Sequence, residues 1–191
     1  MADGLGPAVS DSTPLIYLAK IGRLSLLSGV FRSVHIPEAV FDEAVAQGKA
    51  LNMTDAFIIE RAVGDWITVE RVKPDVDAEY GFIDANARLG AGEREALKLC
   101  KQLGATYLVA DDHEARRVAR ILSVKPVGTL GVLVEAHRLG LILKSEALKT
   151  LDDLMKAEFR MSVSLYRRVL DELETQNRRF NQPQSQQMGK E

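Results

Sequence analysis

The chain has 191 residues, of which 46% are hydrophobic and 27% charged, and its formal net charge is −2. This length favours one domain with a large core, since domains run to ~250 residues, and the charge is not that of the usual basic nucleic-acid binder. The single cysteine, Cys100, excludes an internal disulfide framework and lies in an apolar stretch, so we expect a buried thiol in a cytoplasmic protein. We expect no membrane span and no signal peptide, because no apolar run approaches ~20 residues and the first residues lack the basic-then-apolar layout.

Apolar segments of strand length alternate along the chain with longer segments of helical period. This alternation is typical of βαβ units and predicts an α/β fold with a mostly parallel central sheet. We expect a single domain over residues 7–175, a short segment 1–6 before it, and a disordered glutamine-rich tail at 181–191. The expected strands cover residues 7–10, 34–36, 66–69, 107–110 and 125–127. One expected helix begins at Pro14 and another ends at His137. The other expected helices cover residues 24–30, 37–47, 53–63, 75–89, 92–103, 112–121, 145–155 and 162–175.

Acidic residues follow two of the expected strands at the point where each strand ends. Asp11 follows the first strand, and Asp111 and Asp112 follow the fourth. Binding sites in open α/β sheets form beyond the carboxyl ends of the strands. Carboxylates that meet there repel one another unless a cation lies between them, and Mg²⁺ and Mn²⁺ prefer oxygen ligands. The sequence therefore predicts a metal-dependent enzyme with an acidic pocket at this edge.

The helix that begins at Gly92 carries two more candidate acids, Glu93 and Glu95. Glu93 lies in the first turn, where a carboxylate meets free amides and the positive end of the helix dipole. Glu95 is rotated roughly 200° from it, so the two side chains cannot share a face. We therefore expect Glu93 to cap the helix and only one of the two acids to point at a metal.

Capping offers a structural explanation for the other acids as well. The run Asp11-Ser12-Thr13-Pro14 is a good helix start. Only one residue of the Asp111-Asp112 pair need be a ligand. A mid-helix acid such as Glu43 is by itself more often solvated. These residues alone leave capping and ligand roles open. The three histidines show no ligand spacing and no phosphate-binding glycine loop is present, so a zinc site and a P-loop are both disfavoured.

Several segments, taken in order, resemble the PIN-domain family of nucleases, most closely its small prokaryotic members related to VapC-type toxins. The resemblance implies a three-layer fold, with a parallel sheet wrapped by helices and an acidic pocket that binds Mg²⁺ or Mn²⁺. It also implies RNA as substrate, and a small antitoxin protein or a second copy of the chain as partner. The segments that carry it are residues 9–19, 36–43, 92–97, 109–116 and 127–133, with 159–162 near the end.

The resemblance also assigns roles to individual residues. Asp11 matches the first acid of the family, Glu43 the helical glutamate, Glu95 the third acid and Asp112 the fourth, with Asp111 beside it. Glu95 stands where the family usually has aspartate, so the carboxylate is displaced by about a bond length. The metal would lie between Asp11, Glu95 and an aspartate of the 111–112 pair. Residues expected to orient ligands, water or RNA are Ser12, Thr13 and Thr129, with Arg116, Arg117 and Arg120 either on the RNA backbone or on a solvated helix face.

We therefore expect a divalent-metal-dependent ribonuclease, the toxin of a toxin–antitoxin pair. One alternative is a non-catalytic nucleic-acid-binding module that keeps the fold. The other is a phosphatase or phosphotransferase with Asp11 as nucleophile. Such sites usually carry a second aspartate two residues later, where this chain has Thr13.

Overall fold

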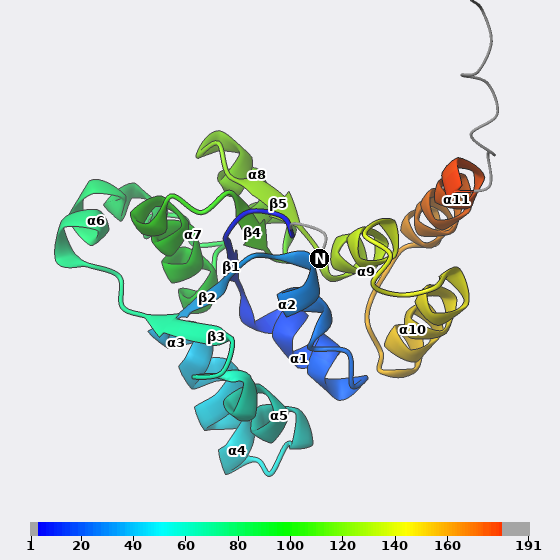
Figure 1. Cartoon of the computed structure of the whole chain (residues 1–191). Helices are drawn as coiled ribbons and strands as arrows, with labels where there is room; N and C mark the ends of the chain where they lie inside the picture. Colours follow the sequence, from blue (N-terminus) through cyan, green and yellow to red (C-terminus); the bar gives the residue numbers. More distant parts are fainter. Residues whose placement is uncertain (1–3, 181–191) are drawn as a thin grey trace, which may run out of the picture.

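The computed structural model describes residues 4–180 and has a five-stranded sheet at its centre. All neighbouring strands are parallel, in the order β3-β2-β1-β4-β5 (Figure 1). The predicted α/β fold is confirmed. The strands are β1 (Ala8–Ser10), β2 (Val34–Pro37), β3 (Ile67–Glu70), β4 (Tyr107–Val109) and β5 (Lys125–Val127).

Helices cover both faces of the sheet and make three layers. Side chains alternate along a strand, so Ala8 packs in one core with α1, α2, α5 and α9 to α11, whereas Val9 packs in a second core with α7 and α8. The helices of the first layer are α1 (Ser12–Lys20), α2 (Leu26–Val30), α5 (Thr54–Ala62), α9 (Thr129–Arg138), α10 (Lys144–Lys156) and α11 (Val163–Phe180). Those of the second are α7 (Ala91–Leu103) and α8 (His113–Ile121). Beyond the end of β2 lie α3 (Glu38–Phe41), a π-helical turn η1 (Asp42–Gln47) and α4 (Gly48–Ala50).

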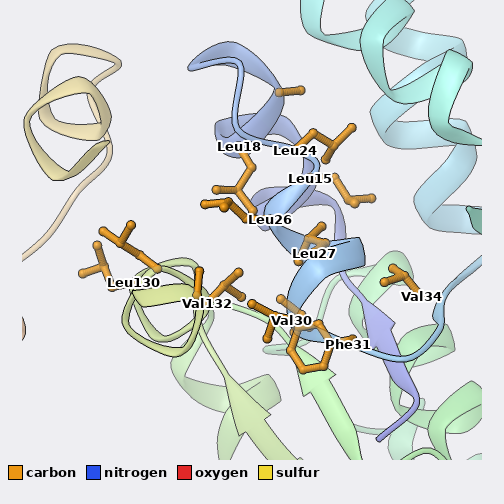
Figure 2. Close-up of a cluster of buried hydrophobic side chains, with 14 of the residues drawn as sticks. Leu15, Leu18, Leu24, Leu26, Leu27, Val30, Phe31, Val34, Leu130 and Val132 are labelled. Atoms are coloured by element: carbon orange, nitrogen blue, oxygen red, sulfur yellow. The ribbon is translucent and has the colours of Figure 1, made fainter. Parts of the chain in front are cut away.

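The first core joins the two ends of the chain. Figure 2 shows leucines of α1 and α2, such as Leu18 and Leu27, gathered beside Leu130 and Val132 of α9. Leu173 of α11 is fully buried in the same cluster. Each such side chain contributes ~1.5–3 kcal/mol by burial, so the C-terminal helices are held firmly against the layer that begins with α1.

The prediction of one helix over residues 75–89 is wrong. The structure has a short helix α6 (Pro74–Glu79), a 3₁₀ turn η2 (Gly81–Ile83) and then turns up to Gly90. Lys98 of α7 is 3% exposed, and its ammonium donates hydrogen bonds to both Asp77 and Asp84. A continuous helix would hold these two acids about 10.5 Å apart along its axis, so they could not meet at one nitrogen.

Burial lowers the pKa of Lys98, but the hydrogen bonds to Asp77 and Asp84 outweigh it and raise the pKa overall. The ammonium therefore stays charged and ties the segment before α7 to that helix. The remaining predicted elements are present with ends shifted by a few residues, except that the helix predicted over 37–47 is divided by η1. No helix within residues 4–180 has the length and apolar character needed to cross a bilayer. The predicted tail, 181–191, lies outside the described residues.

Candidate acidic site

The site lies where the strand order reverses, at the carboxyl ends of β1 and β4. β1 pairs with β2 on one side and with β4 on the other, which makes this edge the switch point at which α/β sheets form binding crevices. The backbone N–H of Asp11 donates a hydrogen bond to the carbonyl of Val109 at 2.9 Å and extends the β1–β4 pairing by one residue. Asp11 is thereby fixed at the end of the central strand.

Asp11 is a buried acid in a negative environment. The residue is only 3% exposed, and burial of its carboxyl group raises the pKa from 3.8 to about 7. The negative charges of Glu93 and Glu43 add to the increase, whereas the backbone N–H groups of Ser12 and Thr13 lower the pKa in part. A carboxyl group held this way gains from any cation placed beside it.

Gly92, in the first turn of α7, brings two of these acids together. A Cβ atom at this position would lie 3.4 Å from Oδ1 of Asp11 and 3.2 Å from Oε2 of Glu43. It would also lie 3.1 Å from a methyl group of Val40. The start of α7 therefore passes directly over the two carboxylates, and only glycine leaves the space between them open.

Two further acids join this group from helix starts. Glu93 accepts a hydrogen bond from the Gly90 N–H at 2.8 Å, the cap predicted from the sequence. Its pKa is raised by burial first and then by the charges of Asp112 and Glu43. Asp112 accepts a hydrogen bond from the Ala115 N–H at 2.8 Å and caps α8. We call the four acids Asp11, Glu43, Glu93 and Asp112 the acidic pocket.

Glu95 has a hydrogen-bond partner outside the acidic pocket. Its Oε2 accepts a hydrogen bond from the backbone N–H of Ala39 at 3.1 Å, in the first turn of α3. The residue before that helix is Pro37, which has no side-chain acceptor for a free amide. The family resemblance assigned Glu95 to the metal and left Glu93 as a cap. In the structure Glu93 also lies among the acids, and Glu95, three residues after Gly92 on the same side of α7, uses one oxygen to hold α3. The ligand role of Glu95 stays a prediction.

Asp111 and Asp112 divide between two helices. Asp111 accepts two hydrogen bonds from Thr129, one from its backbone N–H at 2.9 Å and one from its hydroxyl at 2.6 Å. Burial raises the pKa of Asp111, while the bonds from Thr129 and the charge of Arg116 lower it. Both oxygens of Asp111 are thus used to hold the start of α9, and Asp112 is the member of the pair that faces Glu93.

The donor chemistry of the acidic pocket fits a hard divalent cation, because it consists of carboxylate oxygens from four separate segments. Within residues 4–180, however, no three His, Cys, Asp or Glu side chains are already gathered tightly enough to hold an ion. Glu43 is exposed, so its side chain is free to change rotamer. The pocket therefore supplies the right ligands without a preassembled cage.

These features define an α/β protein with an acidic pocket at the switch point of a parallel sheet. A family model described as PIN domain matches residues 7–175, and the chain belongs to the PIN-domain family. Among solved structures it is similar to the crystal structure of Mycobacterium tuberculosis VapC20, described as a Sarcin-Ricin loop cleaving toxin. The identity is 12% over 58% of this chain and 94% of that one, with a TM-score of 0.46. No curated protein sequence matches this chain significantly.

Proposed function

We propose that the chain is a divalent-metal-dependent ribonuclease whose acidic pocket holds the cation. The observation that carries this proposal is the position of Asp11 at the switch point. Burial raises the pKa of this carboxyl group, and two neighbouring acids raise it further. Membership of the PIN-domain family supports hydrolysis of phosphodiester bonds in RNA. Mg²⁺ and Mn²⁺ are the ions that suit an all-carboxylate set.

The residues of the pocket have different tasks in this proposal. Asp11 is held by the strand pairing and by the N–H groups at the start of α1. Glu93 and Asp112 each use one oxygen in a cap, which fixes the direction of the carboxylate, and Glu43 can turn toward the ligand from the surface. A bound cation would offset the four negative charges and stabilise the charge that develops on the phosphate during hydrolysis.

Three polar residues near the pocket are proposed to assist it. Ser12 and Thr13 form the first turn of α1, beside Asp11. Thr129 is fully buried and orients Asp111 through two hydrogen bonds. Asp111 and Thr129 therefore support the pocket by joining the end of β4 to α9, and an ion need not contact them directly.

We further propose that the enzyme acts as the toxin of a toxin–antitoxin pair, with a small antitoxin protein or a second copy of the chain as partner. The resemblance to VapC-type members of the family motivates this proposal. Co-purification with the product of an adjacent short reading frame would support it. Normal growth of cells that express the chain alone would count against it.

Cleavage of labelled RNA in Mn²⁺, with and without EDTA, tests the proposed activity. Wild-type protein should cleave only with metal, Glu93→Gln should lose most of the activity, and Glu95→Gln should keep it. These two variants differ by two positions on one helix and remove the same charge, so each is the control for the other. Absence of cleavage by wild type under all metal conditions would overturn the proposal.

A non-catalytic RNA-binding module is the second candidate, and the lack of a preassembled three-ligand group in residues 4–180 favours it. Such a module would bind RNA in EDTA and leave it intact in Mn²⁺. An Asp11 nucleophile is less favoured, because a pKa of about 7 keeps much of this carboxyl protonated at neutral pH. Failure to trap a phosphorylated protein with a small phosphate ester would exclude it.

A further inference from the structure

A groove of about 310 Å³ lies next to the acidic pocket, between the end of β5, α9 and α11. Asp111 and Arg116 are among its lining residues, so it reaches the Asp111-Asp112 pair. One wall is apolar and includes Val127, Phe159 and Leu165. Figure 1 shows α9 and α11 side by side, with α9 following directly from β5.

Arg116 lines this groove and has a hydrogen-bond donor without a partner among the described residues. Its Nη1 lies 3.4 Å from the Cβ position of Gly128, and its Nε is buried with no hydrogen-bond partner in the described part of the chain. The nearby acid Asp111 already accepts two bonds from Thr129. A guanidinium with free donors in a groove suits an oxyanion such as a phosphate.

Two more arginines, Arg160 and Arg168, line the same groove and are exposed. Neither forms an ion pair with another residue in 4–180. Of the other two acids in the wall, Glu135 is paired with Arg138 at 2.6 Å, and Glu172 is exposed without an ion pair among the described residues. Three guanidinium groups therefore line the groove with two carboxylates that have no ion pair among the described residues, Asp111 and Glu172, so positive charge is in excess.

We propose that this groove binds single-stranded RNA beside the bond that the acidic pocket cleaves. A base would lie against the apolar wall while Arg116, Arg160 and Arg168 contact phosphates, the combination that single-strand binding proteins use. The volume is that of a pocket for one nucleotide-sized ligand. This inference rests on the proposed nuclease function, and it assigns α11 to the substrate-binding surface.

Fluorescence anisotropy with a labelled RNA single strand of about eight nucleotides tests this inference. The measurement uses Asp11→Asn protein in EDTA, so that binding is observed without cleavage. Arg160→Gln and Arg168→Gln should each weaken binding severalfold and reduce the slope of log Kd against log salt by about 0.7. Glu172→Gln should strengthen binding, because it removes the opposing charge.

Arg32→Gln is the matched control. Arg32 is exposed and lies at the opposite edge of the sheet, where its N–H bonds to the Leu5 carbonyl before β1 begins, so this variant should bind like the parent. If the two groove variants also bind like the parent, the inference is overturned even where wild type cleaves RNA. If Glu172→Gln weakens binding as the arginine variants do, the groove takes a different occupant, such as a protein segment, and the inference is likewise overturned. If the groove variants lose binding but wild type does not cleave RNA, the groove still binds RNA and the proposed nuclease function is rejected.

Discussion

Glu95 and Ala39 are joined by a hydrogen bond of 3.1 Å, in which the carboxylate on α7 accepts the backbone N–H at the start of α3. This contact predicts a structural role for Glu95. Glu95→Ala should lower the free energy of unfolding by about 1 kcal/mol, the usual effect of losing a helix cap. Glu95→Gln keeps an oxygen acceptor and should lose less, with RNA cleavage close to wild type.

Urea unfolding and the cleavage assay together check this prediction. Glu93→Gln is the comparison, because Glu93 lies among the acids of the pocket. If Glu95→Gln abolishes cleavage without loss of stability while Glu93→Gln remains active, Glu95 is the ligand and Glu93 is only a helix cap.

Replacement of Asp11 should stabilise the metal-free protein. The folded-state pKa of about 7 lies above the ordinary value of 3.8, so wild type loses stability relative to Asp11→Asn as the pH rises from about 4 to 7. At pH 7.5 in EDTA the variant should be more stable by up to about 4 kcal/mol, and below pH 4 the difference should vanish. Thermal melts across this range measure the effect.

Added Mg²⁺ or Mn²⁺ should raise the melting temperature of wild type, because a ligand that binds only the folded state stabilises it by mass action. Asp11→Asn should lose most of this gain. Equal metal-induced shifts in the two proteins would remove Asp11 from the set of ligands.

Gly92→Ala should close the acidic pocket. The added methyl group would meet oxygens of Asp11 and Glu43 at 3.2–3.4 Å, so we expect a cost of about 1 kcal/mol from overpacking and a loss of the metal-induced rise in melting temperature. Gly90→Ala is the control, since a Cβ there has 3.8 Å to the nearest atom. A Gly92→Ala protein with normal metal response would show that ions bind elsewhere.

Glu114 should contribute fully to stability above about pH 4.5 and lose this contribution in acid. Hydrogen bonds from Arg117 and Asn86 lower the pKa of Glu114 from 4.5 to about 2. The contribution is therefore complete above about pH 4.5 and is lost as the pH falls toward 2. Wild type should be more stable than Glu114→Gln at pH 7, and urea titrations should show the two proteins converging near pH 2; a constant difference would contradict the assignment.

The strand-end acids could be predicted because their signals are local. Asp11 and Asp112 each follow an apolar strand and begin a helix, and the pattern that identifies the strand also places the acid at the edge of the sheet. The cap made by Glu93 is equally local, since donor and acceptor lie three residues apart. The order of these segments along the chain was sufficient to identify the PIN-domain family, which the family match confirms.

The features that the sequence did not predict depend on contacts between distant segments. The position of Glu95 depends on its hydrogen bond with the backbone N–H of Ala39, which is 56 residues away. The groove beside the pocket brings Arg116 of α8 together with Arg160 and Arg168 near α11, and no short-range pattern joins these residues. The periodicity of apolar residues predicts which face of each helix is buried. It does not predict which distant residue a polar side chain will contact.

The two carboxylates around Lys98 have a consequence for how this chain can vary. The segment from α6 to Gly90 is irregular and largely exposed, which usually marks a place where insertions and deletions are tolerated. Here it carries Asp77 and Asp84, the partners of a buried ammonium, and an ammonium left without them is strongly unfavourable. Related chains that shorten this segment should therefore carry an uncharged residue at the position of Lys98, so that loop length and one core residue change together during evolution.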